Sequence, residues 1–143
     1  MSCPPPLPRA GIDPIDDPHT ALGVVVRAFH VPPIHETVAV LLDAQRRGMC
    51  IAVVSDTDPP DREVDVVECF ANIAATSDRV GGMIIASRRP GGGLEPADLD
   101  RWMEMNELAA AAGVELVEWF VVGVWPALPR ELLGDPPRWG GAA

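Results

Sequence analysis

The chain has 143 residues, of which 48% are hydrophobic, which is enough for one domain with a packed core. Its formal net charge is −10, although all 11 basic residues are arginine, so nonspecific binding to the phosphates of nucleic acids is disfavoured. No apolar run reaches the ~20 residues that span a bilayer. The N-terminus lacks the pattern of a signal peptide, and we therefore expect a cytoplasmic protein without a membrane partner. Arginine without lysine is typical of a GC-rich bacterial genome.

The N-terminal part of the chain predicts a helix followed by a hairpin. Residues 1–18 are rich in proline and aspartate, and we expect them to form a flexible segment. The stretch 19–31 predicts a short helix, with Thr20 as its N-cap. Apolar and β-branched residues fill 36–44 and 49–56 on either side of the turn sequence QRRG, which predicts two antiparallel strands.

Helices and strands alternate over the rest of the predicted domain. Asp58, followed by proline, suits the N-cap of a helix that runs to about residue 76. A buried strand is predicted at 80–86, a helix from Pro96 to about residue 112, and a last strand at 114–124. The order β-β-α-β-α-β predicts a single α/β (α+β) domain, in which helices flank a mixed sheet.

The last segment, 125–143, is a tail rich in proline and glycine. Trp125 and Trp139 flank it, and they either pin the tail onto the domain or stay exposed for a partner. The three cysteines have no metal-like spacing, and we expect the two within the domain to be small buried hydrophobic residues.

Four stretches, in order along residues 34–124, resemble one known family. They are "IHETVAVLLDAQRRG", "REV", "MIIASRRPGGGLEPADLD" and "AAAAGVELVEWFVVG". Together they are similar to the RadC branch of the JAB/JAMM (MPN) metallopeptidase-like domains. The resemblance implies a JAB/MPN (cytidine deaminase-like) architecture for residues 19–124.

In that family two histidines and an aspartate bind zinc, and a glutamate near the first strand acts as general base. The resemblance places Glu36 at the general base and Asp100 at the third ligand. Ser87 and Arg89 stand at the two histidine positions, and Ala97 replaces a serine that assists the oxyanion. Arginine offers no lone pair to a metal and repels a dication. The resemblance therefore implies a degenerate motif with no metal, no cofactor and no catalytic residue.

These observations favour a non-catalytic member of the family, a pseudoenzyme that acts as a protein-interaction or regulatory module. Domains of this family commonly pair with themselves or with related domains, which makes a homodimer plausible. We expect Arg89 to take the electrostatic place of the metal by bridging Glu36 and Asp100 with bidentate hydrogen bonds.

Two other functions are compatible with the same residues. One is a hydrolase of altered chemistry that uses Glu36 and Asp100. The other is a small-anion sensor, whose candidate binding residues are Arg88, Arg89, Gly91, Gly92 and Gly93. A plainer interpretation places Asp100 on a solvated helix face and makes Glu36 an ordinary acid at the start of a strand.

Overall fold

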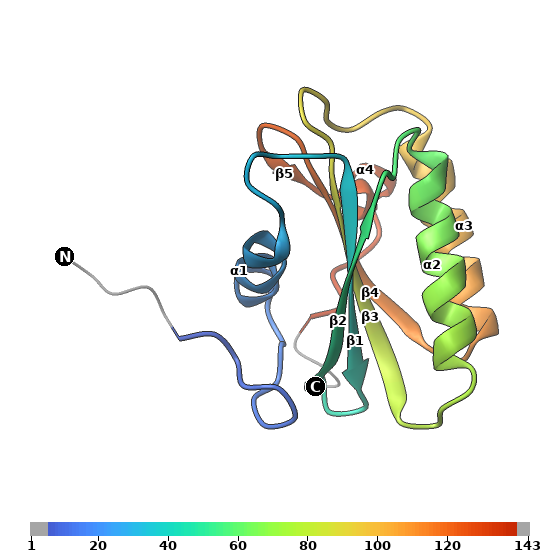
Figure 1. Ribbon diagram of the computed structural model, residues 1–143. Helices are drawn as coiled ribbons and strands as arrows, with labels where there is room; N and C mark the ends of the chain where they lie inside the picture. The colour runs from blue at the N-terminus through green and yellow to red at the C-terminus, as the bar shows by residue number, and fades with distance from the viewer. Residues whose placement is uncertain (1–5, 140–143) are drawn as a thin grey trace.

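The computed structural model describes residues 6–139 and contains one sheet between two layers of helices (Figure 1). In chain order the elements are α1 (Pro18–Ala28), β1 (Glu36–Asp43), β2 (Gly48–Ser55), α2 (Asp61–Ala74), β3 (Val80–Arg88), α3 (Asp98–Ala111), β4 (Glu115–Val122), β5 (Pro126–Ala127) and α4 (Pro129–Leu133). The predicted α/β class with a mixed sheet flanked by helices is confirmed. Among the described residues, no helix has the length and hydrophobicity needed to cross a membrane.

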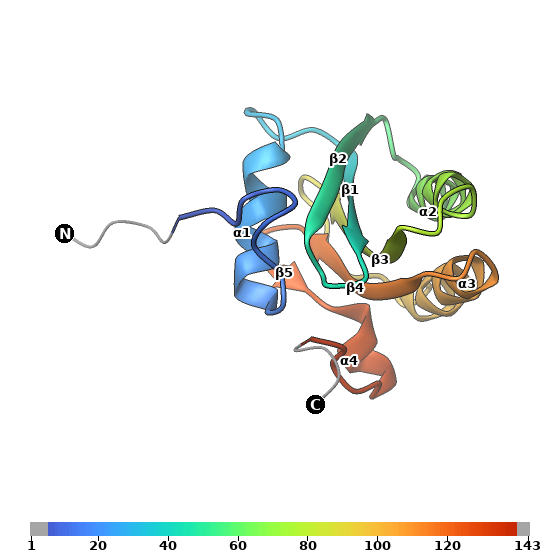
Figure 2. The ribbon, with the colours of Figure 1, turned by 90° about the horizontal axis from the view of Figure 1, so that it is seen from below.

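The sheet has the strand order β2-β1-β3-β4-β5. Strand β1 is antiparallel to β2 and to β3, so the predicted hairpin is confirmed. Strands β3 and β4 are parallel, and α3 connects them. Viewed along the strands, α1 lies on one side of the sheet, and α2 and α3 lie on the other (Figure 2).

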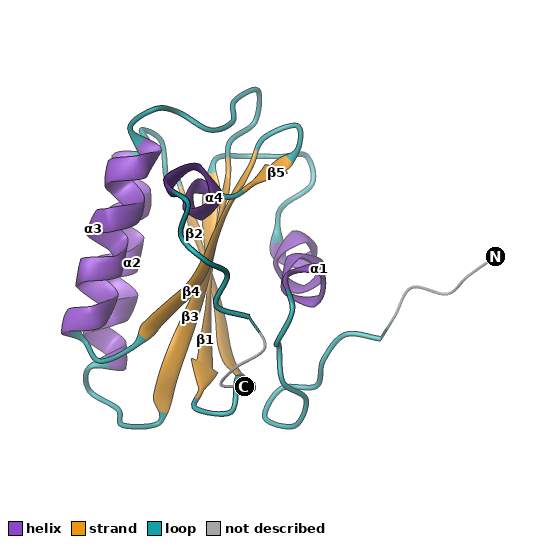
Figure 3. Cartoon of the chain, turned by 180° about the vertical axis from the view of Figure 1, so that it is seen from behind, coloured by secondary structure: helices purple, strands orange, loops and turns teal. Residues whose placement is uncertain are grey.

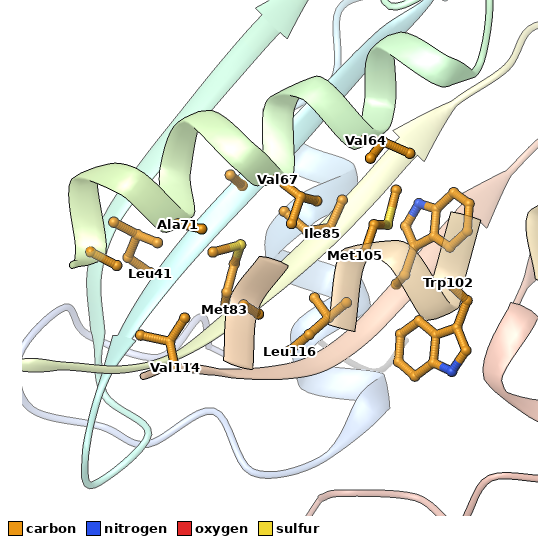
Figure 4. Close-up of a cluster of buried hydrophobic side chains, with 14 of the residues drawn as sticks. Leu41, Val64, Val67, Ala71, Met83, Ile85, Trp102, Met105, Val114 and Leu116 are labelled. Atoms are coloured by element: carbon orange, nitrogen blue, oxygen red, sulfur yellow. The ribbon is translucent and has the colours of Figure 1, made fainter. Parts of the chain in front are cut away.

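The side chains of β1 show how the sheet supports two cores. Because successive side chains of a strand point to opposite faces, Ala39 and Leu41 pack toward α2 and α3, whereas Val38 and Val40 pack toward α1. The first core also contains side chains from both helices and from β3 and β4 (Figure 4). Helices on both faces explain why the central strands are almost continuously apolar.

Two predicted helix caps are wrong. Asp17, not Thr20, caps α1, because its carboxylate accepts a hydrogen bond from the Thr20 backbone N–H at 2.7 Å. Helix α2 begins at Asp61 after Pro60, and its N-cap makes no side-chain hydrogen bond, so Asp58 has no capping role. An aspartate followed by proline is typical of a helix N-cap, but the N-cap of α2 is Pro60, two residues after Asp58.

Both ends of the chain contain more structure than their composition indicates. In the described part of the first segment, the Gly11 N–H donates to the carbonyl oxygen of Gly48 at 3.0 Å, and Ile15 is buried. The segment after residue 124 contains β5 and α4. Of its two tryptophans, Trp139 is partly buried and packs on the domain, whereas Trp125 is 79% exposed.

The expectation of buried cysteines is also wrong for the two that lie within the domain. Cys50 and Cys69 are both exposed, on β2 and on the outer face of α2. Cys3 lies outside the described residues.

Candidate functional site

The guanidinium of Arg89 lies just beyond the end of β3 and is 3% exposed. Its Nε and Nη2 donate to the two carboxylate oxygens of Glu63, each at 2.9 Å. Its Nη1 and Nη2 donate to the carboxylate of Asp98 at 2.7 and 2.9 Å, and Nη1 also donates to the Gly93 carbonyl at 2.9 Å. A guanidinium has five N–H donors, and these contacts use all of them.

Two helix starts bring the acids to this point. Glu63 lies in the first turn of α2, and Asp98 is the first residue of α3. The unpaired N–H groups at a helix start carry partial positive charge, which favours carboxylates there. Asp98 also accepts the backbone N–H of Glu95, three residues before it, at 2.7 Å and the Arg101 Nη1–H at 2.7 Å. The two acids and two arginines form a neutral group that joins β3 to both helices.

The protonation of this group follows from burial and hydrogen bonding. Burial alone would raise the pKa of Asp98, but hydrogen bonds from Arg89, the Glu95 backbone and Arg101 hold that pKa below its usual value. Burial raises the pKa of Glu63, against the opposing hydrogen bonds from Arg89 and Ser87. Burial opposes the charge on Arg89 as well, yet its bonds to Asp98 and Glu63 raise its pKa, so the guanidinium stays charged.

Ser87 lies on the same face of the sheet as Arg89, two positions earlier along the strand. Its buried hydroxyl oxygen accepts the indole N–H of Trp119 at 2.9 Å. The Arg89 guanidinium lies 5.7 Å from the ring centroid of the same tryptophan. The two positions that the resemblance assigns to zinc-binding histidines therefore do share one face, and both are occupied by satisfied polar groups.

Glu36 lies on the opposite face of the sheet, among the side chains that pack toward α1. Its carboxylate is fully buried, accepts the His30 backbone N–H at 2.6 Å and lies 2.5 Å from His30 Nδ1. Asp100 is exposed on α3, which covers the other face. The expectation that Arg89 bridges Glu36 and Asp100 is therefore wrong: it bridges two carboxylates, but these belong to Glu63 and Asp98.

The candidate anion-binding residues are also not brought together. Arg88 points to the α1 side, where its guanidinium lies 5.5 Å from the ring centroid of Phe29. Arg89 points to the α2–α3 side and has no free donor. The glycine loop packs on the sheet, since a Cβ added to Gly123 would lie 1.9 Å from the Gly92 carbonyl oxygen. Ala97 is an exposed residue at the start of α3 and contacts neither arginine through a hydrogen bond.

The sequence contains a pattern that indicates a buried, paired Glu63, although the resemblance assigns no role to this residue. Glu63 precedes Val66 and Val67 by three and four positions, so all three occupy one helical stripe, and all three are buried. An acid on the apolar stripe of a helix needs a cationic partner. Arg89 supplies it, from 26 positions further along the chain.

The residues at this site do not fit a zinc ion. The space between Glu63 and Asp98 is filled by the Arg89 guanidinium, and Ser87 stands at the other position that the resemblance gives to a histidine. Within residues 6–139 no group of three or more His, Cys, Asp or Glu side chains is arranged to hold a metal. Zinc sites use imidazole, thiolate or carboxylate ligands, and a guanidinium is none of these.

Comparison with protein-family models gave no match, and neither curated proteins nor solved structures matched the chain.

Proposed function

We propose that the chain is a non-catalytic, metal-ligand-deficient domain of the RadC/JAB type that acts as a protein-interaction or regulatory module. One observation carries the proposal. At the position that the resemblance gives to a zinc-binding histidine, the buried Arg89 guanidinium joins Glu63 and Asp98 through charge-assisted hydrogen bonds. This network holds the end of β3 against α2 and α3, and it occupies the space that a catalytic metal ion would need.

The electrostatic cost of a metal at this point supports the proposal. A dication beside this group would be repelled by Arg89 and attracted by Glu63 and Asp98, and because the arginines already balance the two acids, the group offers it no net attraction. Displacing Arg89 instead would break buried ion pairs, which costs about 3–5 kcal/mol when one partner is lost. Neither binding beside Arg89 nor displacing it favours zinc.

The two alternative functions receive less support from the geometry. A hydrolase that uses Glu36 and Asp100 would need them in one site, but the sheet separates the buried Glu36 from the exposed Asp100. An anion sensor would need Arg88 and Arg89 to face one site, but Arg89 uses all its donors on the α2–α3 side, whereas Arg88, whose buried Nε has no partner among the described residues, lies over Phe29 on the α1 side. The net charge of −10 disfavours nucleic acid as a partner.

Titration calorimetry with Zn²⁺ on the metal-free protein tests the proposal. We expect no stoichiometric binding to the native chain. Binding of one Zn²⁺ per chain that disappears in Asp98→Ala would contradict the proposal, because it would show that the acids are available to a metal.

A second variant tests the resemblance itself. In Ser87→His/Arg89→His, two imidazoles would project from one face of the sheet, next to the carboxylates of Glu63 and Asp98. We expect this variant to gain stoichiometric zinc binding while its circular dichroism spectrum stays native. If the double variant folds but binds no zinc, these positions do not correspond to a metal site and the resemblance is not supported.

A further inference from the structure

Strand β2 forms an open edge of the sheet. It pairs with β1 on one side, and within residues 6–139 no strand pairs with its other side along Ile51–Ser55. None of its eight residues is fully buried. Figure 2 shows β2 at the end of the strand row, away from the edge that α4 covers.

The direction of the backbone groups on this edge follows from the register with β1. The Asp56 N–H donates to the His35 carbonyl at 3.0 Å, which marks a hydrogen-bonded pair. Hydrogen-bonded and non-hydrogen-bonded pairs alternate along an antiparallel ladder. The N–H and C=O groups of Ile51, Val53 and Ser55 therefore point outward, to the free edge.

The N-terminal segment covers only the beginning of this edge. The Gly48 carbonyl points outward and accepts the Gly11 N–H at 3.0 Å, and Pro14 makes an isolated bridge with Arg47. Beyond Gly48 the edge is open to a further strand.

The composition of β2 leaves this edge unprotected. Its sequence, GMCIAVVS, contains no charge and no proline, although these are the common devices that keep edge strands from pairing. Met49, Ile51 and Val53 are 39%, 51% and 39% exposed. Since Ile51 and Val53 are opposite Val40 and Val38, they form an apolar stripe on the α1 side of the sheet.

We propose that β2 pairs antiparallel with β2 of a second copy of this chain, about a two-fold axis at Val53. This register uses all three outward-facing residues, because Ile51 of each copy meets Ser55 of the other. It joins the two apolar stripes and continues the sheet through both copies. The inference deepens the proposed function, on which it rests, by naming the partner of the module and the surface that binds it.

Charge at the two ends of the strand favours a second copy in this orientation. Arg47 precedes β2, whereas the exposed Asp56 and Asp58 follow it. Arg46 does not contribute, because it pairs with Glu115 of its own chain. Antiparallel pairing brings the arginine end of each copy to the aspartate end of the other, and a parallel pair would oppose like charges. Arg47 bonds to Asp43 within its own chain, but its side chain is still 39% exposed.

Sedimentation velocity over a range of concentrations tests the proposal with a matched pair of variants. Ile51 on β2 and Ile73 on α2 are 51% and 50% exposed, so lysine is tolerated equally well at both positions. We expect the native chain and Ile73→Lys to dimerise, and Ile51→Lys to be a folded monomer. A monomeric native chain, or a dimer that persists in Ile51→Lys, would overturn the proposal; so would equal loss of the dimer in both variants.

Amide hydrogen exchange of the native chain provides a second test. The inward amides of Ala52 and Val54 bond to β1, and we expect them to be protected at every concentration. The outward amides of Ile51 and Val53 should become protected only at concentrations where the dimer forms. If they exchange freely in the dimer, another surface forms it.

The two proposals fail separately in these experiments. A monomer that binds no zinc overturns the β2 pairing and leaves the non-catalytic assignment intact. A dimer that binds one zinc ion per chain overturns the non-catalytic assignment and leaves the β2 pairing intact.

Discussion

At the scale of single residues, the buried carboxylates of the site depend on Arg89 for charge compensation. It is the cationic partner of Glu63, and it shares Asp98 with Arg101. Removing one partner of a buried ion pair leaves a charge without compensation. We expect Arg89→Met to lower the free energy of unfolding by about 3–5 kcal/mol, measured by guanidinium chloride denaturation.

The adjacent Arg88 provides the control for this variant. Arg88 is partly exposed, makes no ion pair within the described residues and stacks on Phe29. We expect Arg88→Met to cost about 1 kcal/mol or less. Adding Glu63→Met to Arg89→Met should recover part of the loss, because one uncompensated carboxylate is then gone. Equal effects of the two arginine variants would contradict the assigned role of Arg89.

The two acids predict opposite dependences on pH. The pKa of Asp98 is lowered in the folded state, so its carboxylate stabilises the fold above its unfolded pKa of about 3.9. This contribution is lost as pH falls through the folded-state value. The stability difference between the native chain and Asp98→Asn should therefore shrink below about pH 4.

Glu63→Gln is the counterpart of that experiment. Burial raises the pKa of Glu63 in the folded state, so protonation favours the fold. As pH falls through this raised value, the native chain should gain stability relative to Glu63→Gln. Denaturant titrations between pH 7 and pH 3 measure both differences. If both stability differences change in the same direction as pH falls, at least one of the two pKa directions is wrong.

The sequence predicts that Arg89 binds two carboxylates, but not which two. Its motif contains an acid at each expected position, yet strand alternation puts Glu36 on the α1 face, while Arg89 belongs to the other. The choice between Asp98 and Asp100 depends on where α3 begins, and local signals do not fix helix starts to better than one or two residues.

At the scale of elements, a second buried ion pair holds the C-terminal segment in place. Arg130 on α4 donates from Nε to both carboxylate oxygens of Glu118 at 3.2 and 3.1 Å, and Glu118 is fully buried on β4. The Trp139 indole N–H donates to the same carboxylate at 3.1 Å, and the Trp102 indole N–H reaches Asp135 at 2.9 Å. Figure 3 shows α4 and the segment after it running along β4.

Arg130→Ala tests this attachment. Among the described residues it leaves the buried Glu118 with the Trp139 indole as its one remaining side-chain partner, and we expect a loss of about 3 kcal/mol. Glu131→Ala, at the exposed neighbouring position, should change stability by at most about 0.5 kcal/mol. Thermal unfolding followed by circular dichroism compares them. If Arg130→Ala has the same unfolding midpoint temperature as the native chain, the C-terminal segment does not contribute to the stability of the fold.

The elements that the sequence predicts well are the ones with a long, regular pattern. The apolar, β-branched runs of β1, β3 and β4 identify strands, and the turn between β1 and β2 identifies the hairpin. Strand β5 has two residues and α4 has five, which is too short for a periodic signal. They are fixed by contacts such as Arg130 with Glu118, which join residues 12 positions apart and have no local signature.

At the scale of the whole molecule, buried ion pairs join α2, α3 and α4 to the central sheet, while within residues 6–139 no strand pairs with the outer edge of β2 along Ile51–Ser55. The Arg89 network joins β3 to α2 and α3, and the Arg130 pair fixes the C-terminal segment on β4. A rigid frame with one unprotected apolar edge suits a module that binds other proteins. Under the proposed function, Arg89 takes the place of a metal because it balances the charges of Glu63 and Asp98.

A crystal grown in the presence of zinc, with anomalous diffraction measured at the zinc edge, tests this account most directly. We predict electron density for the Arg89 guanidinium between Glu63 and Asp98, and no anomalous peak there. An anomalous peak bound by those carboxylates, with Arg89 turned away from them, would contradict it.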